Sequence, residues 1–287
     1  MNTVKTAMLL AFLTAILLIA GGAIGGRGGA TIALIFAGVM NFGAYWFSDR
    51  VVLKMYRAKE VSPSDAPQLH GLVRDLAMKA KLPMPKVYIM DNPTPNAFAT
   101  GRNPHHAAVA VTTGIVDILS KEELTGVIGH ELAHIQNRDI LVSTIAATIA
   151  GAISYLAYMA QWAMIFGGGR RDERGGGHPL VMILMMIVAP LAAMVVHMAI
   201  SRTREYGADR GGAAICGNPI YLANALKKLE GANRQRPMAN AREATAHMFI
   251  VNPLKGGGML KWFSTHPPMA ERVKRLEAMV GGIGERG

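Results

Sequence analysis

The sequence has little cysteine and little charge, and each shortage excludes a class of protein. A single cysteine, Cys216, allows no intramolecular disulfide and leaves no cysteine-rich zinc site. Charged residues make up 17% of the 287 residues and hydrophobic residues 51%, a balance opposite to that of a disordered chain. The chain has no Gly-Lys dipeptide, which a phosphate-binding P-loop requires, so we expect no nucleotide partner.

The missing charge is concentrated in four long stretches. Residues 6–26, 28–48, 140–169 and 175–201 contain no Asp, Glu, Lys or Arg. About 20 apolar residues of helix cross the hydrocarbon core of a bilayer, which is about 30 Å thick. The sequence therefore predicts a membrane protein with up to four spans.

The charge that remains is strongly basic, with a formal net charge of +11. Basic residues gather at the ends of the apolar stretches, which is typical of the cytoplasmic side of a membrane and of contact with anionic lipid. We therefore expect the lipid bilayer, and no nucleic acid, to be the partner of these residues. They are Lys5, then Arg50, Lys54, Arg57 and Lys59, and then Arg202, Arg204 and Arg210.

The apolar stretches divide the chain into two hairpins and two soluble parts. We expect residues 1–47 to form an N-terminal transmembrane hairpin and residues 140–200 a second one. The turn of the second hairpin carries three arginines, which disfavours export, so this hairpin either spans the bilayer or only enters it. Residues 48–139 and 201–287 have ordinary charge and are expected to form one catalytic domain.

The soluble parts show clear helix and strand signals. Ser120 and Glu123 form a capping box that opens a helix over residues 121–139. We expect this helix to continue without a break into the third apolar stretch. Periodicity and turn residues predict further helices at 64–82, 114–119, 219–231, 239–249 and 269–280, and strands at 86–90, 96–100 and 107–112.

A His-Glu-x-x-His motif lies on the helix predicted at 121–139. Residues four apart lie on one face of a helix, so His130 and His134 can both bind one zinc ion. Glu131 can then take a proton from a water molecule that the zinc activates. The motif on a helix is the pattern of a zinc metalloprotease.

A catalytic zinc ion needs a third protein ligand, and Glu205 is the best candidate. Residues 137–139 are Asn, Arg and Asp, and residue 140 is Ile, so the glycine and the third histidine of the extended motif are absent. Glu205 follows the fourth apolar stretch, where an antiparallel return brings it beside His134. Asp209, four residues later on the same helix face, can accept the free N–H of a ligand histidine. The alternative for Glu205 is a solvated helix end that faces nearby arginines.

Residues 130–134, 205–209 and 264–272 together resemble the HtpX heat-shock family of membrane zinc metalloendopeptidases and, more distantly, the CAAX prenyl protease. The resemblance covers essentially the whole chain. It implies an α-helical integral membrane protein with an α+β zincin-like metalloprotease domain and one zinc ion. It also implies a multi-pass protein of the bacterial cytoplasmic (inner) membrane, which cleaves misfolded or unassembled membrane proteins at the cytoplasmic face.

The C-terminal part of the resemblance adds two residues to the site. His266 precedes two prolines, and a histidine beside the zinc can stabilise the oxyanion that forms in peptide hydrolysis. The alternative is a packed or solvated histidine at a helix entry. Arg272 either braces Asp209 or His266, or is one more solvated charge.

The segment Asn96, Ala97, Phe98 and Ala99 resembles the edge strand of the same family. A bare strand edge binds an extended peptide through backbone hydrogen bonds, with little side-chain selectivity. We therefore expect these four residues to bind substrate, although an ordinary solvated edge strand fits the same pattern.

Two other functions remain to be weighed against a membrane zinc endopeptidase. An intramembrane zinc protease carries its motif inside an apolar span, whereas here charged residues flank the motif. A zinc transporter or sensor needs ionisable residues that face one another within its spans, and Glu131 has no task in it.

Overall fold

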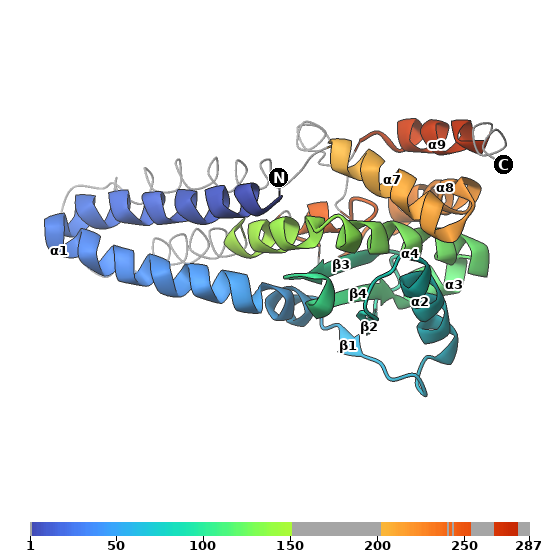
Figure 1. The fold of residues 1–287 in the computed structure, drawn as a ribbon, viewed down its shortest axis with the longest axis horizontal. Helices are drawn as coiled ribbons and strands as arrows, with labels where there is room; N and C mark the ends of the chain where they lie inside the picture. The colour runs from blue at the N-terminus through green and yellow to red at the C-terminus, as the bar shows by residue number, and fades with distance from the viewer. Residues whose placement is uncertain (1, 151–201, 240, 243, 254–266, 281–287) are drawn as a thin grey trace, which may run out of the picture.

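The computed structural model describes residues 2–150, 202–239, 241–242, 244–253 and 267–280, and shows a long helical hairpin that projects from an α+β domain (Figure 1). The expected spans within 151–201 lie outside these residues, as does most of the predicted second hairpin. The fold is mostly helical.

Both arms of the hairpin belong to one element, α1 (Asn2–Met55), whose backbone stays helical almost throughout. The chain reverses near Gly26, whose φ of 56° lies in the left-handed region that glycine tolerates. Behind this turn the two arms touch, because a Cβ atom at Gly29 would lie 2.2 Å from the carbonyl oxygen of Gly21. Further along, the Asn41 side chain donates hydrogen bonds to the Thr14 hydroxyl and the Leu10 carbonyl of the other arm.

Among the described residues, one helix is long and apolar enough to cross a membrane, Gly26–Met55 of the second arm. Its large apolar side chains are exposed, as at Ile32 (70%) and Ile35 (66%). The apolar helices Val4–Ile19 and Asp139–Ala150 are shorter. In Figure 1 the two arms of α1 run side by side away from the domain.

The domain contains a four-stranded sheet in the order β1-β2-β4-β3. Strand β2 pairs with β4 in parallel, while the β1–β2 and β3–β4 pairs are antiparallel. The predicted strands match β2 and β4 in their bounds, and β3 begins one residue later than expected. The strands are β1 (Lys59–Glu60), β2 (Lys86–Met90), β3 (Ala97–Gly101) and β4 (Ala107–Thr112).

Helix α4 (Lys121–Gln136) lies at the centre of the domain, between the sheet and helices α7 and α8 (Figure 1). It begins at the predicted capping box, where Ser120 and Glu123 bond each other's backbone N–H. The other helices are α2 (Pro67–Lys79), α3 (Thr113–Ile118), α7 (Arg202–Cys216), α8 (Pro219–Gln235) and α9 (Met269–Ala278), with short 3-10 turns η1 (Pro104–His106) and η2 (Ala246–Met248).

Alternation along β3 gives the sheet a core on each face, because successive side chains of a strand point to opposite sides. Ala97 and Ala99 face the main core with Val127 and Ile128 of α4. Phe98 faces a second core, where its ring packs against Tyr56 and Phe249. The strand that carries the predicted substrate edge is therefore held rigidly from both sides.

Two helix predictions are wrong. Helix α4 does not continue into the next apolar stretch: it ends at Gln136, and Arg138 adopts φ 58° before a new helical stretch begins at Asp139. The described residues of 239–249 form only the turn η2, since packing of Met248 and Phe249 into the second core overrides their helix signal.

Candidate metal centre

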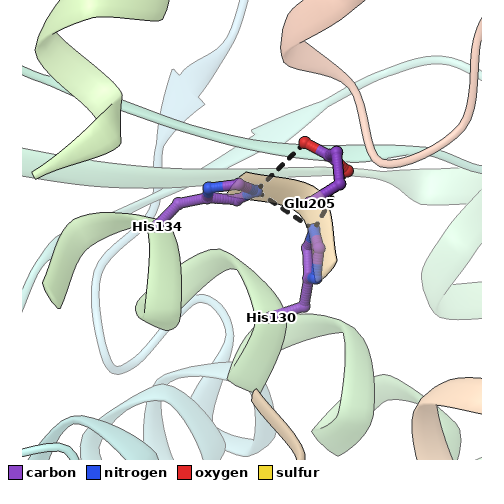
Figure 2. Close-up of side chains that lie close together, drawn as sticks. All are labelled: His130, His134 and Glu205. Carbon is purple, nitrogen blue, oxygen red and sulfur yellow. Dashed lines mark hydrogen bonds and ion pairs between the residues drawn. The ribbon is translucent and has the colours of Figure 1, made fainter. Parts of the chain in front are cut away.

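Three side chains from two helices converge in the domain, as Figure 2 shows: His130 and His134 of α4, and Glu205 of α7. The Nε2 atoms of the two histidines are 3.2 Å apart. Glu205 Oε1 lies 3.5 Å from His134 Nε2, and Oε2 lies 3.9 Å from His130 Nε2. The structure thus brings together the three residues that the sequence predicted as metal ligands.

The donor set fits zinc. Two imidazole nitrogens and one carboxylate form a known catalytic zinc set, which leaves a fourth position open. Ligand atoms about 2.0–2.1 Å from a tetrahedral ion lie about 3.3 Å from one another. The observed separations of 3.2 to 3.9 Å between the ligand atoms match that geometry closely.

Glycines allow α7 to approach α4 closely enough for Glu205 to reach the histidines. A Cβ atom at Gly212 would lie 2.7 Å from the backbone nitrogen of His130, and one at Gly129 would lie 3.0 Å from the Gly212 carbonyl oxygen. Any larger side chain at Gly212 would push the helices apart. The helix contact therefore sets the distance between the ligands.

Each ligand histidine has an acidic partner at its other ring nitrogen. Asp209 Oδ1 lies 3.0 Å from His130 Nδ1, as expected from its place one turn after Glu205. Asp139 Oδ2 lies 3.2 Å from His134 Nδ1. Helix periodicity does not predict this contact, because five residues along a continuous helix would carry the Asp139 side chain away from His134.

Arg272 of α9 is fully buried and pairs with Asp209 through two hydrogen bonds, Nε to Oδ2 at 2.9 Å and Nη2 to Oδ1 at 2.6 Å. It is therefore not a solvated charge. Its Nη1 also donates to the Ile250 carbonyl at 3.1 Å and lies 3.5 Å from Glu205. Arg272 thus links the candidate ligands to the segment that follows η2.

Burial controls the ionisation of the protein groups in this site. It lowers the pKa of His130 to about 4, although the hydrogen bond with Asp209 opposes the shift. It raises the pKa of Glu131 to about 7, against the opposing effect of His134, the Ala99 backbone and Arg272. His130 is therefore neutral, as a metal ligand must be, and Glu131 is a stronger base than an exposed carboxylate.

Glu131 lines a small cavity together with the three candidate ligands. The cavity has a volume of about 30 Å³, which accommodates water but no peptide. Its other walls come from Ala99 of β3, from Ile140 and Ser143, and from residues 247–250. A buried base beside a metal-ligand cluster and space for water is the arrangement that hydrolysis requires.

Strand β3 is the outer strand of the sheet, but its edge is not bare as predicted. The Ile250 N–H donates to the Ala97 carbonyl at 3.0 Å, and the Asn96 side chain bonds the backbone of Val251. The edge is covered there because the segment after η2 packs into the second core through Phe249. Further along the strand, the backbone of Ala99 bonds the Glu131 carboxylate.

His266, the predicted oxyanion donor, lies outside the described residues. Another histidine, His247, lines the cavity, and its Nε2 lies 3.1 Å from the Ser143 carbonyl oxygen. No motif in the sequence predicts a function for His247. Its place at the site depends on the path of residues 244–251, which no local motif indicates.

Comparisons with known proteins identify the family of the chain. Residues 63–280 match the family model of Peptidase family M48. The chain is 63% identical over 280 residues to a Protease HtpX homolog from Syntrophotalea carbinolica, covering 97% of this chain and 99% of that protein. It is 64% identical over 279 residues to a Protease HtpX homolog from Thermodesulfovibrio yellowstonii, with the same coverage.

A solved structure shares the fold. The crystal structure of Ste24p from S. mikatae aligns with a TM-score of 0.53 at 17% identity, over 96% of this chain. The chain spans 65% of the length of that protein. At this identity the likeness shows the fold alone.

Proposed function

The chain belongs to Peptidase family M48 and is a metalloprotease of the HtpX type, and from this premise we propose that it is a zinc endopeptidase of the bacterial cytoplasmic membrane. Its substrates are misfolded or unassembled membrane proteins, which it cleaves at the cytoplasmic face. The observation that carries the proposal is the convergence of His130, His134 and Glu205 beside the buried base Glu131.

His130 and His134 hold the ion through Nε2, and Glu205 holds it through its carboxylate. When bound, zinc supplies the Lewis acidity for hydrolysis. The partners at Nδ1 fix both imidazoles in the tautomer that presents Nε2 to the metal. The chain thus presents a rigid site, because α4 and α7 are locked together through Gly212.

Glu131 acts as the general base. It accepts a proton from the attacking water and passes it to the amine that leaves. Its burial raises its pKa, which makes it a stronger base than an exposed carboxylate.

Backbone recognition accounts for a preference for unfolded substrate. The part of β3 beyond the covered Ala97 would pair with an extended peptide through main-chain hydrogen bonds, which select no particular side chain. A peptide needs far more room than a cavity of about 30 Å³. Residues 248–250 line the cavity beside that edge.

Contacts of the first hairpin with the third apolar stretch and with the domain support a site near the membrane surface. Leu9 and Leu13 of the first arm pack with Val142 and Ile145, just beyond the motif. Trp46 lies in a run of aromatic residues on the second arm, and the Arg102 guanidinium stacks on it at 4.7 Å. Aromatic and basic residues favour the membrane interface, so this run supports a headgroup level next to the domain.

The main alternatives make different use of the site. An intramembrane zinc protease has its motif within an apolar span, but α4 packs between a sheet and two amphipathic helices. A zinc transporter or sensor has no use for a buried base beside the ligands. No observation favours either alternative over a protease at the membrane surface.

Proteolysis by the purified protein tests the proposal. We expect detergent-solubilised wild type to cleave a permanently unfolded protein, a chelator to stop cleavage, and zinc to restore it. Glu131→Gln is the matched control, because it leaves the ligands in place and removes the base. It should keep zinc and lose about 10²–10⁴-fold in rate. Cleavage that resists the chelator, or a Glu131→Gln protein of normal activity, would contradict the proposal.

A further inference from the structure

We infer that Asp139 is a positioning residue for the zinc ligand His134. The inference rests on the zinc site proposed above. Asp139 Oδ2 accepts a hydrogen bond from His134 Nδ1 at 3.2 Å, while His134 Nε2 faces Glu205 at 3.5 Å. The carboxylate therefore holds the proton on Nδ1 and leaves the lone pair of Nε2 for the metal.

The backbone after the motif is shaped to make this contact. At 100° per residue, a side chain five positions further along a continuous helix points about 140° away from the first. Helix α4 instead ends at Gln136, and Arg138 adopts φ 58°, a conformation that is unfavourable by about 1–2 kcal/mol for a residue other than glycine. The left-handed conformation of Arg138 redirects the chain and brings the Asp139 carboxylate next to the His134 ring.

Burial and charge around Asp139 repeat the arrangement at the other ligand. Asp139 is 4% exposed and Asp209 is 3% exposed, so neither carboxylate is in bulk water. Asp209 is paired with Arg272, and the positive charge of Arg204 lies near both Asp139 and Glu205. Each ligand histidine thus has an aspartate at Nδ1 and an arginine close to that aspartate.

A purely structural role for Asp139 is the rival explanation. The residue begins the helical stretch Asp139–Ala150, and an acidic side chain in a first turn stabilises a helix by about 0.3–1 kcal/mol. Such a role predicts a change in stability but no specific effect on zinc. The two explanations therefore differ in whether the effect of Asp139 depends on His134.

A double-mutant cycle on the full-length protein in detergent separates them. We measure zinc affinity by competition with a chromophoric chelator for wild type, Asp139→Ala, His134→Ala and the double variant. We expect Asp139→Ala to weaken zinc binding by about 10–100-fold in the wild-type background, and to have no further effect once His134 is absent. Asp139→Asn, which keeps an acceptor, should restore part of the loss. Asp117→Ala, which removes an exposed acid, is the control and should bind zinc normally.

Two results overturn the inference. One is an Asp139→Ala protein with wild-type zinc affinity, which leaves the proposed function intact. The other is an equal loss of affinity with and without His134, which identifies a structural role. A wild-type protein that binds no zinc overturns the inference and the proposed function together.

Discussion

The ionisable side chains of the metal centre are buried, so their neighbours rather than water decide their charge. Burial would lower the pKa of His134, but the Asp139 hydrogen bond and the Glu205 and Glu131 carboxylates outweigh it and raise that pKa. Burial raises the pKa of Glu131 to about 7. Among the protein groups alone, both residues therefore carry protons in mildly acidic solution.

Zinc binding should expel these protons, because a ligand histidine must be neutral and a nearby divalent ion favours a carboxylate. At about pH 6.5 we expect more than one proton to be released per zinc ion bound, falling as the pH rises above both pKa values. Calorimetry in buffers of different ionisation enthalpy measures this number. Glu131→Gln should release fewer protons than wild type, and equal release by the two proteins would show that Glu131 is already ionised.

The residues of the site differ in how far the sequence predicts them. His130, Glu131 and His134 form a local motif, and helix periodicity alone places them on one face. Glu205 lies 71 positions beyond His134, and its selection relied on its place after an apolar stretch. Asp139 could not be found by periodicity, because its contact depends on the left-handed conformation of Arg138.

At the scale of elements, the site forms where α7 crosses α4, and Gly212 of α7 packs directly against the α4 backbone at this crossing. Gly212 meets the His130 backbone closely, whereas a Cβ atom at Gly207, on the same helix, would meet nothing within 4 Å. The distance from Glu205 to the histidines therefore depends on Gly212 and not on Gly207.

Replacing these two glycines makes a matched test. Gly212→Ala should destabilise the fold by about 1–3 kcal/mol through overpacking and weaken zinc binding, because it moves α7 away from α4. Gly207→Ala should keep zinc affinity and gain up to about 1 kcal/mol from helix propensity. Denaturant unfolding and chelator competition report the two effects. Normal zinc affinity in Gly212→Ala would show that the helix contact does not position Glu205.

Elements with strong local signals were predicted well. The apolar, β-branched strands β2 and β4 match their predicted bounds, and the Ser120–Glu123 capping box opens α4 as expected. The errors lie in segments whose conformation is determined by tertiary contacts rather than by local sequence. Residues 239–249 carry helix signals, but the described ones pack as an irregular segment against Tyr56 and Phe98, and the residues that follow, Ile250 and Val251, cover the edge of β3.

At the scale of the whole molecule, the hairpin of α1 exposes apolar side chains along an arm of 30 residues, Gly26–Met55, and ends in basic residues beside the domain. Our proposal places that basic end, and with it the metal centre, on the cytoplasmic side. The turn near Gly26 then lies on the opposite side of the membrane.

Cysteine labelling tests this orientation. In a Cys216→Ser background, we place one cysteine either at Gly28 in the turn or at Ser64 on the domain, both of which are exposed. An impermeant thiol reagent should label Gly28→Cys on intact cells and Ser64→Cys only after lysis. Labelling of Ser64→Cys on intact cells would place the domain outside and contradict the proposed orientation.

The central claim is that His130, His134 and Glu205 together hold one catalytic zinc ion, and metal analysis of ligand variants tests it most directly. Wild type, His130→Ala, His134→Ala and Glu205→Ala are purified in detergent and dialysed against the same low concentration of free zinc. The account predicts one equivalent of zinc in the wild type and loss of most of it, together with proteolysis, in each variant. A full equivalent of zinc in any of the three would remove that residue from the ligand set and contradict the account.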